Sequence, residues 1–126
     1  MKYNCKIAEI NEEYVTVQIG DIFITGFVNC GVNKKIGQEA KIEILLYDDL
    51  KITQCEEKRT SIERKGKSLA YSIFGILDIE NRIVKSSIDF EIDEEELYNY
   101  GYMDGTQVKI DVLRIDFYFE WYLISC

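Results

Sequence analysis

The sequence predicts a single all-β domain with one short helix, folded as a small barrel or a two-sheet sandwich made of two related halves. Two observations support this prediction. Apolar and polar residues alternate along several short stretches, and one part of the chain resembles a later part. Proline is absent, so glycine, asparagine and aspartate must supply the turns between strands. A length of 126 residues with 47% hydrophobic content fits one domain, residues 1–126.

Alternation with a period of two is typical of half-buried strands. It occurs in YVTVQIG, AKIEILL and SIDFEID, whose apolar positions are mostly β-branched or aromatic. The residues expected to face inward are Val15, Val17, Ile19, Ala40, Ile42, Ile44, Leu46, Ile88, Phe90 and Ile92. One helix is expected from Asp93 to Tyr100, because an aspartate cap precedes EEEL, which suits the positive end of a helix dipole.

A pattern recurs along the chain at a spacing of 68 to 69 residues. IGQEAKIEILLYDD, from Ile36, aligns with DGTQVKIDVLRIDF, from Asp104, and IAEINEEYV aligns with ILDIENRIV. Unrelated strands after glycine turns could look alike, but the shared order of the elements favours an internal duplication. The expected divisions are a first half at 1–55, a polar linker or hairpin at 56–70 and a second half at 71–126. A glycine turn before such a strand is also typical of small barrels, OB-like barrels included.

The absence of histidine excludes the usual general base, Ser-His-Asp and Cys-His arrangements, and histidine-containing metal sites. The cysteines lack the paired spacing of a zinc or redox motif and are expected to be reduced thiols in a cytoplasmic protein. They are Cys5, Cys30, Cys55 and Cys126. We expect no catalytic residue, metal, cofactor or membrane segment. A hydrolase that uses Asp48 and Asp116 as a carboxylate pair is the lowest-ranked interpretation.

Acidic residues gather in one part of the chain. Residues 89–120 hold ten carboxylates against Lys109 and Arg114, which accounts for the net charge of -8. The negative electrostatic potential of these carboxylates repels the phosphate groups of nucleic acids, so nucleic-acid binding is disfavoured. In DFYFEWYLI, alternate residues face the core: either Phe117, Phe119 and Trp121, or Tyr118, Glu120 and Tyr122.

Tyrosines interleaved with acids suit a basic protein partner, because the acids attract it and the rings anchor it. The expected partner-binding residues are Glu94, Glu95, Tyr98, Tyr100, Tyr102, Asp116, Tyr118, Glu120 and Tyr122.

The leading hypothesis is a non-enzymatic protein-binding module, such as an immunity protein or antitoxin that neutralises a basic toxin. The alternative is an OB-like barrel module that binds nucleic acid or a small ligand through the basic segment 58–67. This segment contains Lys58, Arg59, Arg64, Lys65 and Lys67. A third interpretation is a subunit that forms homo-oligomers through its sheet edges.

Overall fold

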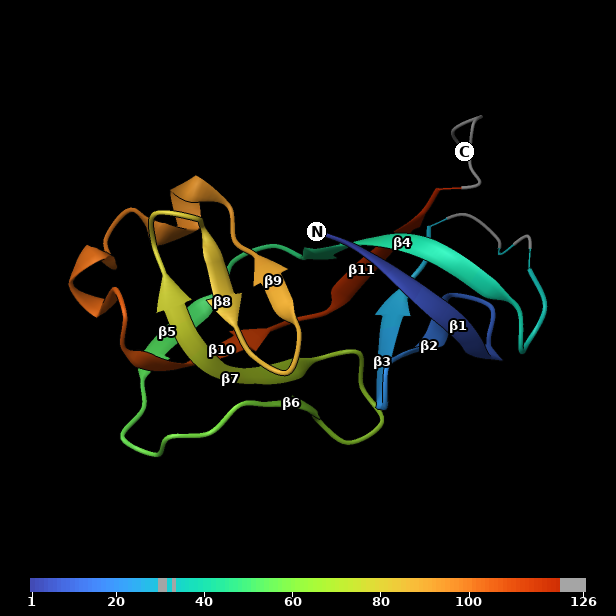
Figure 1. The fold of residues 1–126 in the computed structure, drawn as a ribbon, viewed down its shortest axis with the longest axis horizontal. Helices are drawn as coiled ribbons and strands as arrows, with labels where there is room; N and C mark the ends of the chain where they lie inside the picture. Colours follow the sequence, from blue (N-terminus) through green and yellow to red (C-terminus); the bar gives the residue numbers. More distant parts are fainter. Residues whose placement is uncertain (30–31, 33, 121–126) are drawn as a thin grey trace.

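The computed structural model describes residues 1–29, 32 and 34–120, and this part of the chain is built from strands without α-helices (Figure 1). Five strands form a closed barrel in the order β1-β2-β3-β11-β4. They are β1 (Lys2–Ile10), β2 (Tyr14–Ile19), β3 (Ile22–Phe27), β4 (Glu39–Leu46) and β11 (Ile115–Phe119). The barrel is mixed, because β11 pairs in parallel with β3 and antiparallel with β4. The predicted small barrel is confirmed.

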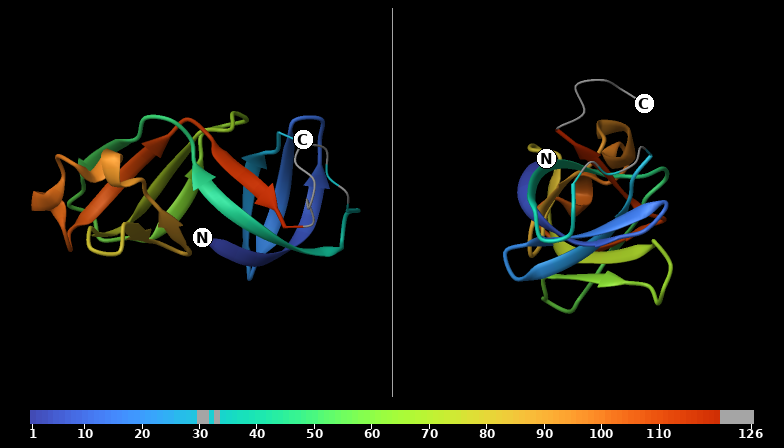
Figure 2. Two further views of the ribbon diagram at one scale, coloured as in Figure 1. Left: turned by 90° about the horizontal axis from the view of Figure 1, so that it is seen from above. Right: turned by 90° about the vertical axis from the view of Figure 1, so that its right-hand side faces the viewer.

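A second, antiparallel sheet lies beside the barrel and makes the molecule elongated (Figure 2). Its strand order is β5-β10-β7-β8-β9, with β6 also paired to β7. The strands are β5 (Lys51–Gln54), β6 (Ser61–Arg64), β7 (Tyr71–Asp78), β8 (Ile83–Lys85), β9 (Asp89–Glu91) and β10 (Gln107–Val112). No helix in the described part of the chain is long and apolar enough to cross a membrane.

The residues predicted to face inward belong to one hydrophobic core that both sheets share. Six of them are buried: Val15, Val17, Ile42, Ile44, Phe90 and Ile92. The other four are partly buried against the same core: Ile19, Ala40, Leu46 and Ile88. On β11, Phe117 and Phe119 face inward while Tyr118 is 51% exposed. Trp121 and Tyr122 lie outside the described residues.

The predicted helix is shorter and tighter than expected. Two 3₁₀ turns, η1 (Glu94–Leu97) and η2 (Gly101–Met103), occupy the region, and the side chain of Asp93 makes no capping hydrogen bond. Leu97 is the buried residue of η1. One apolar contact is too little to stabilise an α-helix of this length, because most helical stability in proteins comes from packing of a whole apolar face.

The pairing order is the same in both sheets. The order β4-β1-β2-β3 in the barrel matches β10-β7-β8-β9 in the second sheet, and the aligned sequence segments fall on these strands. The strand that follows β4 is β5, which lies in the second sheet, whereas β11, which follows β10, completes the barrel. The division into halves 1–55 and 71–126 stays a prediction, and each predicted half contributes strands to both sheets.

Candidate functional site

Four of the predicted partner-binding residues come together on η1, η2 and the loop between them. Glu94 and Glu95 are exposed on η1, and Tyr98 and Tyr102 are 84% and 73% exposed. Figure 1 shows both turns beside the second sheet, at the end of the molecule away from the barrel. With two further exposed acids, Glu80 and Asp93, these residues form what we name the acidic tyrosine surface: Glu80, Asp93, Glu94, Glu95, Tyr98 and Tyr102.

The local sequence explains why these side chains point outward. Ile92, Leu97 and Met103 are buried and attach the segment to the core. The glutamates of η1 and the two exposed tyrosines lie between these attachments and face solvent. Asp104 adds a further attachment, because its Oδ1 accepts a hydrogen bond from the backbone N–H of Ile79 at 2.9 Å. These anchors fix the segment against the turn that joins β7 to β8.

The turn between β7 and β8 has its own stabilising contacts. Asp78 accepts hydrogen bonds from the side chain and the backbone N–H of Asn81, at 2.8 and 3.1 Å. These bonds, with a smaller contribution from Lys85, hold the pKa of Asp78 below its ordinary value. Arg82 adopts a φ of 55°, and its carbonyl oxygen accepts a hydrogen bond from the N–H of Ile92. The turn therefore holds Glu80 beside η1.

Three adjoining hollows surround η1. The first, of about 370 Å³, is lined by Ile79, Glu80, Arg82, Glu94, Leu97 and Tyr98. The second hollow has a volume of about 580 Å³ and shares Arg82 and Glu94 with the first. The third hollow has a volume of about 200 Å³ and shares Glu91 and Asp93 with the second. The carboxylates that line them are Asp48, Glu80, Glu91, Asp93, Glu94, Glu96 and Asp116.

Few cations neutralise these carboxylates. Arg82 lines the first two hollows, and its Nη1 lies 3.5 Å from Glu94 Oε2. The N-terminal ammonium of Met1 lies 2.6 Å from Glu91 Oε1, and Arg114 pairs with Asp116 at 2.8 Å. Glu80, Asp93 and Glu95 make no ion pair within the described part of the chain. The acidic tyrosine surface therefore carries uncompensated negative charge that is open to solvent.

The other predicted partner-binding residues are not part of this exposed surface, although Asp116 lines the third hollow. Tyr100 is partly buried against the core. Asp116 is buried and accepts a hydrogen bond from Arg114 Nε at 2.8 Å. Tyr118 is on β11, in the barrel, and Glu120, just beyond it, forms an ion pair with Lys2 at 2.8 Å. The hydrogen bond from Lys2 holds the pKa of Glu120 below its ordinary value.

The basic segment 58–67 is largely occupied by internal contacts. Its central residues form β6, which pairs antiparallel with β7. Arg59 lies over the Phe74 ring at 3.6 Å, Arg64 donates to the carbonyl oxygen of Ser68 at 2.6 Å, and Lys65 lies 2.8 Å from Asp111. Lys58 and Lys67 are the two cations of the segment without a side-chain partner among the described residues. These contacts favour a structural role for the segment.

The contact between Lys65 and Asp111 predicts a pH-dependent stability. Burial raises the pKa of Asp111, but hydrogen bonds from Lys65 and Ser72 hold it below its ordinary value overall. A lowered pKa stabilises the fold above the unfolded-state value of about 4, and this stability is lost as pH falls through the folded-state value. We expect Asp111→Asn to cost about 1–2 kcal/mol at pH 7 and less at pH 3.

Urea unfolding of both proteins between pH 3 and pH 7 measures this difference. Glu12→Gln, at an exposed position in the turn between β1 and β2, is the control and should be neutral throughout. A cost of Asp111→Asn that is the same at both ends of the pH range would refute the role given to the ionised carboxylate.

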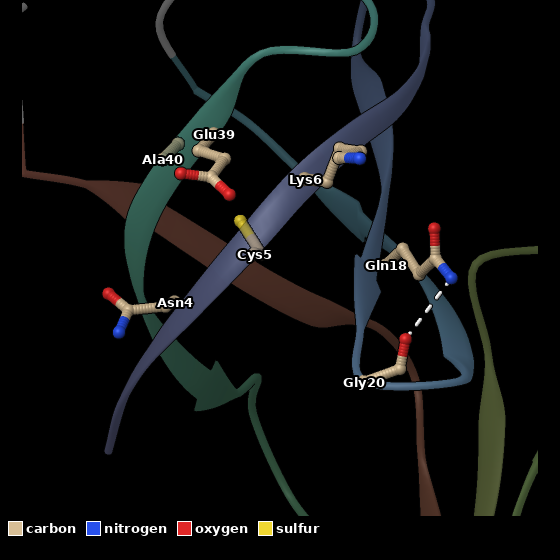
Figure 3. A pocket seen from close by; sticks show the side chains of 7 residues that line it. All are labelled: Asn4, Cys5, Lys6, Gln18, Gly20, Glu39 and Ala40. Carbon is tan, nitrogen blue, oxygen red and sulfur yellow. Dashed lines mark hydrogen bonds between the residues drawn. The ribbon is translucent and has the colours of Figure 1, made fainter.

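A further hollow of about 630 Å³ lies beside β1 and contains Cys5 (Figure 3). Its lining is Asn4, Cys5, Lys6, Gln18, Gly20, Glu39 and Ala40. Burial raises the pKa of the Cys5 thiol to about 11, so at neutral pH it stays protonated and is a poor nucleophile. Within the described residues, no group of three or more acidic or cysteine side chains is arranged to hold a metal ion.

Comparison with known proteins places the chain in a family. Residues 1–120 match the model of the family described as uncharacterised conserved protein UCP019853. The chain belongs to this family. No curated protein and no solved structure matches it. The match to the UCP019853 model runs through both the barrel and the second sheet, so it includes all the residues of the acidic tyrosine surface.

The sequence located part of this surface and missed part. The sequence pattern predicts Glu94, Glu95, Tyr98 and Tyr102 as partner-binding residues, because they lie close together in the chain. Glu80 joins them only through the fold, and its local sequence, DIENR, reads as an ordinary polar turn. The contact between Ile79 and Asp104 that unites the two regions spans 25 residues and leaves no local signal.

Proposed function

We propose that this member of the UCP019853 family is a non-enzymatic protein-binding module whose acidic tyrosine surface binds a basic protein. The observation that supports this proposal most strongly is the set of three adjoining hollows around η1, whose lining holds seven carboxylates against Arg82 and the N-terminal ammonium of Met1. An immunity protein or antitoxin that neutralises a basic toxin in the cytoplasm is the kind of protein that this chemistry fits.

The surface combines attraction at long range with anchoring at short range. Uncompensated carboxylates attract a basic partner across about 10 Å of solution at moderate salt and raise its association rate. Tyr98 and Tyr102 provide large, partly apolar rings that are already exposed and lose little conformational freedom on binding. Tyrosine is enriched among the residues that dominate binding energy for this reason.

A second candidate function follows from the barrel. The order β1-β2-β3-β11-β4, with β3 and β11 parallel, resembles an OB-like barrel, which would bind nucleic acid or a small ligand on the face of β2 and β3. Part of that face is covered here, because Thr25 is 4% exposed and its N–H donates to the Tyr71 hydroxyl at 2.8 Å. The internal contacts of segment 58–67 also leave few cations for phosphates. We therefore rank this function second.

Charge reversal tests the proposed function. We expect Glu94→Lys/Glu95→Lys to weaken binding of a labelled hexa-lysine peptide about tenfold at low salt, because the change places cations where the partner's cations should lie. The control is Glu12→Lys/Glu13→Lys, which alters the net charge equally at exposed positions of the turn between β1 and β2. Fluorescence anisotropy at low and high salt measures both variants.

The control pair separates a local site from a general attraction to an acidic protein. If binding depended only on the net charge of the protein, both double variants would lose the same affinity for the peptide. That result would argue against the acidic tyrosine surface as the binding site. Failure of the unmodified protein to bind the peptide at low salt would overturn the proposed function as a whole.

A further inference from the structure

Arg114 shows how this protein holds an arginine side chain. Its guanidinium carbon lies 3.7 Å from the centre of the Tyr47 ring and 4.0 Å from that of Phe27. Its Nε donates to Asp116 Oδ1 at 2.8 Å. A planar guanidinium lies flat on an aromatic ring and keeps its in-plane N–H groups free for a carboxylate, a geometry that an ammonium group lacks. Lys109 makes the looser arrangement, with its Nζ 6.0 Å from the centre of the Phe74 ring and 3.9 Å from Asp111 Oδ1.

Arg59 is held in the same way. Its guanidinium carbon lies 3.6 Å from the centre of the Phe74 ring, and its Nη1 lies 3.2 Å from Glu63 Oε2. The two sites are on different sheets and share no residue. An aromatic ring beneath the guanidinium, with a carboxylate at its edge, is therefore a recurring way in which this chain binds arginine.

The hollow beside Tyr98 contains an aromatic ring and a carboxylate, and among the described residues no guanidinium is stacked on this ring. The Tyr98 ring forms one wall, Ile79 and Leu97 supply apolar surface, and Glu80 supplies a carboxylate without an ion-pair partner in the described structure. Tyr98 is 84% exposed, so no side chain among the described residues covers its ring. The Arg82 side chain also lines the hollow, where its Nη1 forms an ion pair with Glu94 Oε2 at 3.5 Å.

We propose that this hollow binds an arginine side chain of the basic partner. The guanidinium stacks on Tyr98 and pairs with Glu80, while the aliphatic part of the side chain lies on Ile79 and Leu97. The hollow, of about 370 Å³, is open to solvent and admits a side chain that projects from another protein. This inference rests on the proposed function, and it adds that the surface selects arginine over lysine.

Two peptides of equal charge test the selection. We expect the unmodified protein to bind hexa-arginine about fivefold more tightly than hexa-lysine in fluorescence anisotropy. Tyr98→Leu should abolish this preference, because leucine keeps an apolar side chain but removes the ring, whereas Tyr98→Phe should retain it. Tyr102→Leu, at the other highly exposed tyrosine outside the hollow, is the matched control and should leave the preference unchanged.

A second pair of variants tests the carboxylate. Glu80→Gln should weaken hexa-arginine binding more than hexa-lysine binding, whereas Glu95→Gln should weaken both equally, because Glu95 lies outside the hollow. All these positions are exposed, so thermal melting curves should match that of the unmodified protein.

The outcomes for the two proposals are distinct. Equal affinity for the two peptides, with both weakened by Glu94→Lys/Glu95→Lys, would overturn the selection of arginine and leave the proposed function standing. A preference for arginine that survives Tyr98→Leu would overturn the assignment to this hollow. Absence of binding to either peptide would overturn the proposed function itself.

Discussion

Replacement of Gly75 by alanine is expected to lower the free energy of unfolding by about 3 kcal/mol or more. A Cβ atom at this position of β7 would collide with the backbone carbonyl of Lys85 on the neighbouring strand β8. The obstacle is backbone, so no side-chain rotation can relieve it, and the two strands must separate. Chemical denaturation and thermal melting should show the loss, with the melting temperature lowered by about 10 °C.

A control variant isolates the steric cause. Gly101→Ala replaces a glycine with no neighbouring atom within 4 Å of the added Cβ, at a φ that alanine adopts readily. We expect its stability to lie within about 0.5 kcal/mol of the unmodified protein. Similar losses for the two variants would mean that the close approach of β7 and β8 does not set the cost.

The effect of Gly75→Ala should extend to the acidic tyrosine surface. β8 pairs with β9 through Val84 and Phe90, and the chain then passes directly from β9 into η1. Displacement of β8 therefore shifts the segment that carries Glu94 and Tyr98. We expect the variant to lose peptide affinity as well as stability, whereas Gly101→Ala should keep both.

The strands could be predicted because their pattern is local. Along β2, Val15 and Val17 are buried while Thr16 between them is only partly buried, which is the alternation expected for a sheet with one face in the core. The parity of β11 could not be chosen from the sequence, because both of its faces are aromatic. The fold selects Phe117 and Phe119 for the core and leaves Tyr118 outside.

The site was harder to predict because strand exchange separates residues that are near in sequence. The sequence places Asp116 and Tyr118 in the same acidic, aromatic stretch as Glu94 and Tyr98. In the structure, β10 stays in the second sheet and β11 crosses into the barrel, so Tyr118 lies apart from Glu94 and Tyr98, and Asp116 is buried beside the third hollow. A crossover depends on long-range pairing, and charge counts along the chain contain no information about it.

The second large effect is expected at the seam that closes the barrel, where β3 meets β11. Gly26 on β3 lies under the ring of Phe117, and an added Cβ would come within 2.6 Å of that ring. Phe117 is 2% exposed and surrounded by the core, so its ring has little room to move. We expect Gly26→Ala to cost about 2–3 kcal/mol, measured by urea unfolding.

Unlike the clash at Gly75, this one involves a side chain and can be relieved by a second substitution. Phe117→Leu removes the ring atoms that the new methyl group would meet, and by itself leaves space in the core that also costs stability. The double variant Gly26→Ala/Phe117→Leu should therefore be at least about 1 kcal/mol more stable than the sum of the single losses predicts. Additive losses would show that the ring does not cause the cost at Gly26. Because Asp116 and Phe27 form the single parallel pairing between these strands, the packing of Phe117 on Gly26 is expected to be the main contact that keeps the barrel closed.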